Sequence, residues 1–505
     1  MVSIMLIRII LFALAFCAAV PAYAADWLRA ESDHYIVDAR MDETDLRELV
    51  GIMEEFDRLL IDQLPVERRA GRKLHLHLDS DVTKISAVFG RGTRNHVFST
   101  VDFAGGFMRF RNGDQALIRY QQIFYSQTAY FARASFLRTT PPWFWNGVPA
   151  VFSTTYLNEA GQFVVGAPDV QVPLRRSIAA ADIRTIISEH SNPRMNEWDR
   201  YIANREIARP LLFDMRFAGQ LEAYLDAYNA GQSLEEAAEQ INDLDALADA
   251  IRAFNSNRQP PVRIIVLPPA EPAQITIRPL GEDEVALVSE KAARLWGGRT
   301  ERVARNLNRL TQRYPESDDV WLEYAAAEYD LVRDSQFGGE QVFRGFGFSN
   351  GELVVSSNLY PDTRAWLAVN RALDLEPANS SATFLKAEIL LARLVRSDEE
   401  DESEGFASVR ATLSPFLVNP EQYPLAAALN YQSYLEEGAD PPVASLEALG
   451  RAFVANPQVE AFRYAYASAL ARNGFRAEAQ HLLRSLLNNP RYREASQRVL
   501  DQLMP

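Results

Sequence analysis

The sequence predicts an α+β domain followed by an all-α domain made of helical repeats. Stretches with period-two hydrophobic alternation lie near the beginning, and segments with helical spacing separate them. A proline-rich segment then precedes a second half that is helical throughout. The chain has 505 residues, more than one typical domain, and its apolar content of 48% is sufficient for separate cores.

The first half alternates predicted strands and helices. HYIVDA at 34–39 and KLHLHLDS at 73–80 have the period of strands, and 107–110 suggests another. Between the first two, residues 42–64 place their apolar side chains on one helical face, and Asp42 is of the type preferred at an N-cap. A mixed sheet with helices packed against it is the expected result.

Two further helical regions complete the first half. One runs from 115 to 136, and the other, 233–251, predicts one or two short helices. Ser233, followed three residues later by Glu236, has the capping-box pattern.

A change in composition marks the domain boundary. Six prolines fall between residues 257 and 280, with short apolar runs between them. We therefore expect a first domain at 25–257, a Pro-rich linker or small strand pair at 258–281, and a helical domain at 282–505.

Helices in the second half end repeatedly in an apolar turn followed by proline. The last two intervals, Pro420 to Pro457 and Pro457 to Pro490, are close to the period of about 34 residues of tetratricopeptide repeats. Earlier intervals are longer and contain inserts. The pattern predicts tetratricopeptide-like repeats, with a generic helical bundle as the alternative.

The first 24 residues predict a cleaved signal peptide. Arg8 precedes an apolar run, and Ala22-Tyr23-Ala24 has the form of a signal peptidase site. An N-terminal membrane anchor is the alternative. We therefore expect an exported, periplasmic protein, with secretion as the alternative. The one cysteine, Cys17, lies in this segment, so the exported protein is expected to use neither disulfides nor thiol chemistry.

Charge and hydropathy exclude several classes of partner. The formal net charge is −15, which disfavours binding to nucleic acid or to an anionic membrane surface. After the N-terminal segment, the sequence has no uninterrupted apolar run of the roughly 20 residues that a membrane span needs.

Residues 123–153 resemble the core of gluzincin zinc peptidases, in particular the bacterial peptidase-MA-like domains that often precede tetratricopeptide repeats. In that family a His-Glu-x-x-His helix is followed by a turn of the form Pro-x-Trp-x-x-Glu-Gly-x-Ala-x-x-Phe. The residues of this chain that match that turn are Pro142, Trp143, Phe144, Gly147, Phe152 and Ser153. The likeness extends over about 25–257 and implies a zincin-like fold.

The chemical positions of the motif depart from the family. Tyr125, Ser126 and Ala129 stand where the first histidine, the general base and the second histidine are expected, and Asn146 stands at the third ligand. Ala129 has no donor atom, and a serine is no carboxylate base. No other His-Glu-x-x-His occurs in the sequence. The resemblance therefore implies the fold without the zinc, and we expect no cofactor.

Two other groups of residues are candidates for function. Gln127, Trp143, Trp145 and Asn146 could line the floor of a vacant cleft, although the tryptophans also suit a core position. Separately, His75, His77 and Asp79 share one face of a predicted strand and could bind a metal. Their alternative is a polar sheet face opposite the intervening leucines.

Two functions follow as hypotheses. The first is a non-catalytic pseudo-peptidase that binds a protein or peptide through its repeats, by apolar or mixed recognition. The second is a hydrolase that uses non-standard metal ligands or catalytic residues, with the face of His75 and His77 as its candidate metal site.

Overall fold

The structure is a computed structural model of the whole chain. It describes residues 27–64, 73–79, 95–99, 104–110, 120–169, 178–189, 195–257, 260–295, 300–337, 347–349, 352–354, 363–395 and 403–503. The predicted signal peptide at 1–24 lies outside the described residues.

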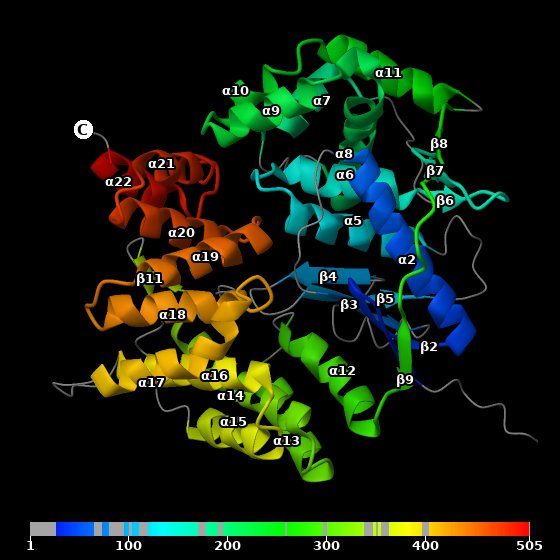
Figure 1. The fold of residues 1–505 in the computed structure, drawn as a ribbon. Coiled ribbons are helices and arrows are strands. Elements are labelled where there is room, and N and C mark those ends of the chain that lie inside the picture. Colours follow the sequence, from blue (N-terminus) through cyan, green and yellow to red (C-terminus); the bar gives the residue numbers. More distant parts are fainter. Residues whose placement is uncertain are drawn as a thin grey trace, which may run out of the picture.

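A six-stranded mixed sheet organises the first domain (Figure 1). Its strand order is β4-β5-β3-β2-β1-β9, in which β2, β3 and β5 are parallel and the remaining pairs are antiparallel. The strands are β1 (Trp27–Glu31), β2 (Tyr35–Arg40), β3 (Leu74–Asp79), β4 (Asn95–Ser99), β5 (Ala104–Arg109) and β9 (Thr276–Pro279). The three predicted strands are thereby confirmed.

Helix α2 (Glu43–Gln63) connects β2 to β3 and belongs to the apolar core of the first domain. The predicted helix is confirmed, and Asp42 occupies its N-cap position without a side-chain hydrogen bond to the backbone. Strand β3 contributes Leu74, Leu76 and Leu78 to the core that α2 shares with α5 (Gln121–Ser135). Of the predicted helix at 115–136, residues before Tyr120 lie outside the described part.

The remaining helices of the first domain follow α5 in the chain. They are α6 (Pro142–Ser153), α7 (Ala180–Ser188), α8 (Glu197–Phe213), η1 (Met215–Phe217), α9 (Gln220–Asn229), α10 (Leu234–Ala238) and α11 (Leu244–Ser256). Helix α6 packs against both α5 and α8. The capping box of Ser233 and Glu236 is present at the start of α10, as predicted.

The Pro-rich segment adds strands to the first domain. Strand β8 (Arg263–Ile265) pairs with β7 (Phe163–Val165), which also pairs with β6 (Tyr156–Leu157). Strand β9 pairs with β1 at the edge of the main sheet. The sheets of the first domain therefore extend into the segment predicted as a linker or strand pair.

The second half is a helical array, which we call the repeat arm. Its helices are α12 (Glu282–Leu295), α13 (Thr300–Arg313), α14 (Asp318–Phe337), α15 (Thr363–Leu375), α16 (Ser380–Leu394), α17 (Ser403–Leu413), η2 (Ser414–Val418), α18 (Pro424–Glu436), α19 (Val443–Ala455), α20 (Glu460–Arg472), α21 (Arg476–Arg484) and α22 (Arg493–Leu503). In the sequence, a small hairpin of β10 (Gly347–Ser349) and β11 (Glu352–Val354) comes between α14 and α15.

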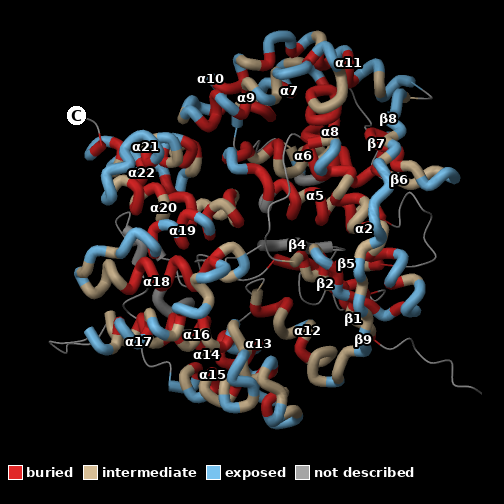
Figure 2. Tube along the Cα trace, in the orientation of Figure 1, coloured by how far each residue is buried: buried red, intermediate tan, exposed pale blue. Residues whose placement is uncertain are grey.

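Successive helices of the repeat arm pack on one another in chain order. In addition, α14 contacts both α12 and α16, α16 contacts α18, and α20 contacts α22. This is the packing of a helical repeat array, in which each hairpin stacks on the next. Figure 2 shows that the buried residues of the arm and of the first domain form separate interiors.

The arm curves back toward the first domain, so that its last helices lie near α9 and α10 (Figure 1). Asn488, which follows α21, donates a hydrogen bond to the carbonyl oxygen of Gln232 over 2.7 Å. Within the described part of the chain, no helix combines the length and apolarity that crossing a membrane requires.

Candidate functional site

Helices α5 and α6 place the four degenerate motif positions. Phe124 on α5 stacks on Phe56 of α2 with ring centroids 3.9 Å apart, which fixes that face of α5 in the core. Residues four apart lie on the same side of a helix, so Tyr125 and Ala129 share another face, and both are partly exposed. Ser126 is fully buried, and its Oγ lies 3.9 Å from Met108 Sδ.

The proline-rich turn determines where α6 begins. Pro141 is the N-cap residue, and Pro142 occupies the first turn, where its missing N–H costs no helical hydrogen bond. Gly147 then allows a close approach to α8, because a Cβ there would lie 2.6 Å from the carbonyl oxygen of Asn204. These residues set where α6 begins and how closely it packs against α8.

The residues predicted from the resemblance to stand at the first and third ligand positions, Tyr125 and Asn146, are in contact. The Tyr125 hydroxyl donates a hydrogen bond to Asn146 Oδ1 over 3.3 Å. The Asn146 amide nitrogen in turn lies 3.4 Å from the carbonyl oxygen of Pro142. Tyr201 of α8 lies beside this pair, with its ring centroid 6.0 Å from that of Tyr125.

The residues at these positions do not fit a zinc ion. Zinc sites in proteins use imidazole, thiolate or carboxylate donors, and at least three of them. Tyr125 offers a phenol, Asn146 an amide, and Ala129 no donor at all. We therefore derive no metal-dependent step at this place.

The other predicted binding residues divide between core and surface. Trp143 is 2% exposed and packs edge-to-face on Tyr224 with centroids 5.5 Å apart, which is the core position. Trp145 and Asn146 are partly exposed. Gln127 is fully buried on the side of α5 that faces α2, where its amide nitrogen lies 2.6 Å from the Tyr35 hydroxyl.

His75 and His77 converge on a carboxylate that the sequence patterns did not single out. His75 Nε2 lies 2.6 Å from Asp38 Oδ2, and His77 Nδ1 lies 3.7 Å from the same oxygen. The guanidinium of Arg29 binds Asp38 through two hydrogen bonds of 2.7 and 3.0 Å. The carboxylate is thus already held by an arginine, and Asp38 is only 1% exposed.

Burial and the neighbouring charges oppose each other in this cluster, and the pKa values of Asp38 and His77 are both lowered. Burial raises the pKa of Asp38, but His75, His77 and Arg29 outweigh it and hold that pKa well below its ordinary range. Burial also lowers the pKa of His77, whose ring stacks on Trp27 with centroids 4.4 Å apart. On the polar sheet face opposite the leucines, His77 is buried and His75 is partly exposed. Because its pKa is lowered, His77 is neutral near pH 7.

The turn before α6 is held by the repeat arm. Arg463 of α20, which is 2% exposed, donates to the carbonyl oxygens of Leu137 and Pro457 over 2.5 and 2.8 Å. Gln458 donates to the carbonyl oxygen of Phe136 over 2.6 Å. The turn that leads into α6 is thus hydrogen-bonded to the end of the repeat arm.

Sequence reasoning missed two groups of polar residues. Asp38 and Arg29 are paired across adjacent strands. The alternation within each strand was visible in the sequence, but it did not indicate that Asp38 lies beside the histidines of β3. The second group joins His34 to Glu54 and Asp57 on α2. The spacing of Glu54 and Asp57 on one helical face was readable, but His34 lies twenty residues earlier and forms no short motif with them.

Comparison with known proteins does not indicate a function for these residues. No protein-family model, curated protein or solved structure matches the chain.

Proposed function

We propose that this chain is an exported pseudo-peptidase that has no catalytic zinc and that binds a protein or peptide through its repeat arm. The first domain provides the scaffold, in a zincin-like arrangement of sheet and helices, and the arm is tetratricopeptide-like. The periplasm is the compartment that the N-terminal segment predicts. The proposal rests on the site geometry and on the way in which the arm is attached.

The Tyr125–Asn146 contact is the observation that carries the proposal. In a zinc peptidase of this type, the metal would connect the two helices at these positions. Here a neutral hydroxyl-to-amide hydrogen bond connects α5 and α6 instead. Such a bond contributes only about 1 kcal/mol and supplies neither a Lewis acid nor an activated water.

The attachment of the repeat arm supports a scaffolding role. Arg463 and Gln458 bind carbonyl oxygens of the turn that leads into α6, and Thr139 Oγ1 lies 3.3 Å from the carbonyl oxygen of Ser485. Buried polar contacts of this kind fix the arm rigidly, which is useful when a repeat surface must be held in one shape for a partner.

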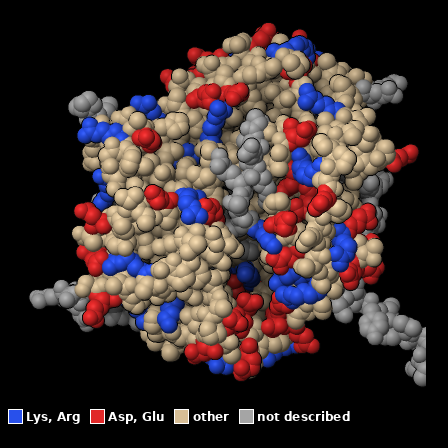
Figure 3. Space-filling model, viewed as in Figure 1, with Lys and Arg blue, Asp and Glu red and all other residues tan. Residues whose placement is uncertain are grey.

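The arm also offers apolar surface. Leu367 on α15 is 65% exposed and Val443 on α19 is 68% exposed. On the face drawn in Figure 3, acidic and basic side chains are interspersed, without one large basic patch. This distribution supports the apolar or mixed recognition expected from the sequence rather than binding of an acidic chain end.

Site-specific photocrosslinking tests the proposal in the cells that make the protein. A photoreactive residue at position 367 or 443 is expected to yield the same discrete adducts, whereas one at Ile61 of α2, 41% exposed, serves as the control. A parallel assay measures hydrolysis of fluorogenic peptides with and without a chelator. Chelator-sensitive hydrolysis, or adducts that do not differ from the control, would contradict the proposal and favour the hydrolase.

A further inference from the structure

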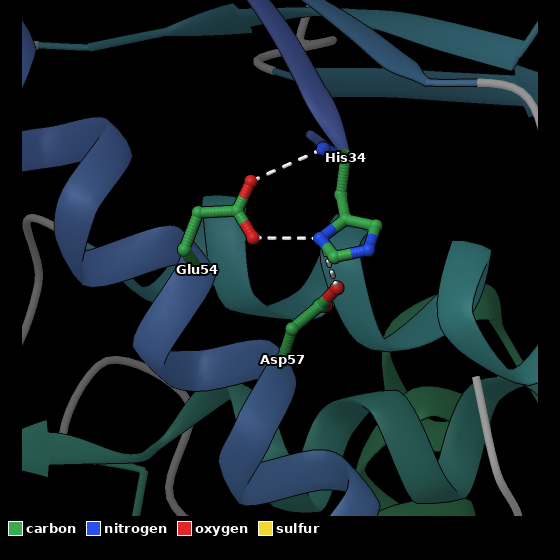
Figure 4. A group of neighbouring side chains, drawn as sticks. All are labelled: His34, Glu54 and Asp57. Atoms are coloured by element: carbon green, nitrogen blue, oxygen red, sulfur yellow. Dashed lines mark hydrogen bonds and ion pairs between the residues drawn. The ribbon is translucent and has the colours of Figure 1, made fainter. Parts of the chain in front are cut away.

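One side chain from the turn between β1 and β2 and two from α2 converge (Figure 4). His34 immediately precedes β2, and Glu54 and Asp57 lie three residues apart on one face of α2. His34 Nδ1 lies 2.7 Å from Glu54 Oε2 and 3.8 Å from Asp57 Oδ2. Each residue offers one ligand atom, and these three atoms all lie within 4.8 Å of one another.

Each carboxylate is oriented through its other oxygen atom. Glu54 Oε1 accepts a hydrogen bond of 3.1 Å from the backbone N–H of His34. Asp57 Oδ1 accepts one of 2.5 Å from the Tyr35 hydroxyl and lies 3.2 Å from the amide nitrogen of Gln127. Outer hydrogen bonds of this kind are what orient the ligands of metal sites in proteins.

The separations suit a small divalent cation. Ligand atoms bound tetrahedrally at about 2.0–2.1 Å lie roughly 3.3 Å apart. The two distances from His34 Nδ1, 2.7 and 3.8 Å, bracket that value, so a shift of the imidazole by about half an ångström would bring both close to it. His34 has the freedom for this shift, because its side chain is 40% exposed.

The charge of the cluster favours a cation as well. The carboxylates of Glu54 and Asp57 have side chains only 11% and 3% exposed. Two buried carboxylates beside a single imidazole put more acidic than basic groups at one point, and a metal ion would balance them.

We propose that His34 Nδ1, Glu54 Oε2 and Asp57 Oδ2 bind one zinc-class divalent cation. One nitrogen and two carboxylate oxygens form a donor set for a borderline metal ion, and the exposed side of His34 leaves a fourth position for water. The ion would tie the turn between β1 and β2 to α2.

This site is separate from the degenerate motif. Gln127, whose amide nitrogen lies 3.2 Å from Asp57 Oδ1, is on the side of α5 that faces the site. It lies two residues from both Tyr125 and Ala129, about 200° around α5, and therefore on the opposite side of the helix from them. It is also separate from the cluster around Asp38, whose carboxylate is bound by Arg29. The inference does not depend on the proposed function.

The test is zinc binding by the mature protein, purified without a His-tag, stripped with a chelator and titrated with a zinc salt in a calorimeter. Elemental analysis of the loaded, desalted protein gives the stoichiometry. We expect one equivalent for the wild type, and at least a tenfold loss of affinity in His34→Ala and in Glu54→Gln. His34→Ala changes a partly exposed side chain, so that variant is expected to remain folded.

Two control variants place the ion. Glu48→Gln removes an exposed carboxylate from the same helix, and His75→Gln removes an imidazole from the other cluster. Both are expected to bind zinc as the wild type does. Less than about a tenth of an equivalent in the wild type would overturn the proposal. So would binding that survives both His34→Ala and Glu54→Gln, or that is lost in His75→Gln.

Discussion

The Tyr125 hydroxyl and Asn146 Oδ1 lie 3.3 Å apart, joining α5 to α6 where two metal ligands would face each other in a zinc peptidase of the type this segment resembles. A hydrogen bond between two neutral groups therefore joins the two helices at this point. What holds the two helices together is packing around α6, and that packing can be tested separately from any function.

Replacing Gly147 by alanine is expected to destabilise the first domain. A Cβ at this position would lie 2.6 Å from the carbonyl oxygen of Asn204 and 3.0 Å from the Cβ of Ala208, so α6 and α8 would have to separate. We expect a cost of about 1–3 kcal/mol, measured by urea unfolding.

Gly51→Ala is the matched control for Gly147→Ala. Gly51 lies inside α2 and has no atom within 4 Å of an added Cβ. Alanine there is expected to stabilise the protein by about 0.5–1 kcal/mol, because it favours helix. Equal effects of the two substitutions would show that α6 and α8 are not in close contact at Gly147.

Asp38→Asn is expected to cost about 3 kcal/mol in the free energy of unfolding at pH 7. The substitution removes the charge that pairs with Arg29 and His75 and leaves a partly buried guanidinium without its carboxylate. Asp62→Asn, at an exposed position of α2, should change stability by less than about 0.5 kcal/mol. If both variants unfold at the wild-type urea concentration, the cluster contributes nothing to stability.

Because of His77, we expect the free energy of unfolding to fall as the pH drops from 7 to 5. Its pKa in the folded protein is lowered by burial, whereas the unfolded chain takes up a proton near the ordinary value of 6.5. The unfolded state thus binds more protons in this window, and unfolding becomes easier by up to about 2 kcal/mol.

Urea unfolding at pH 7 and pH 5 measures this loss. His77→Gln should reduce the difference between the two pH values, whereas His481→Gln, on the exposed surface of α21, should leave it unchanged. A wild-type protein whose stability is the same at both pH values would show that His77 is not held neutral.

Arg463→Met is expected to loosen the junction between the repeat arm and the first domain. The guanidinium is buried and donates to the carbonyl oxygen of Leu137, and burial lowers its pKa to about 10. Loss of these charged hydrogen bonds should cost about 2–4 kcal/mol.

Hydrogen exchange gives the local readout for Arg463→Met. The backbone N–H of Thr139 donates to Asn229 Oδ1 in the same junction, and its exchange should accelerate. Arg472→Met, at an exposed position of α20, is the control. Unchanged protection at Thr139 in Arg463→Met would mean that the arm does not hold this turn.

The elements that the sequence predicted are those with a strong local signal. Helix α2 has one apolar face, and β3 alternates through Leu74, Leu76 and Leu78, so the spacing of the apolar residues alone predicts each element. The capping box at Ser233 is equally local. Strand β9 was not predicted to join the main sheet, because its partner β1 lies about 250 residues earlier.

The polar clusters could not be derived from the sequence for the same physical reason. His75 and His77 were singled out as a pair on a strand, but their partner Asp38 lies on the neighbouring strand, and the register between strands sets the contact. Glu54 and Asp57 share a helical face, yet His34 reaches them only through the turn between β1 and β2. Long-range pairing is what local patterns leave undetermined.

Restoring the ligands tests the central claim most directly. The triple variant Tyr125→His, Ala129→His and Asn146→Glu replaces the three ligand positions and leaves the buried Ser126 unchanged. If these positions form a zincin-like arrangement, the triple variant should bind one equivalent of zinc more than the protein without the three substitutions. Both proteins carry His34→Ala, and elemental analysis measures their zinc content. A variant that keeps its circular dichroism and melting temperature but gains no zinc would contradict the account.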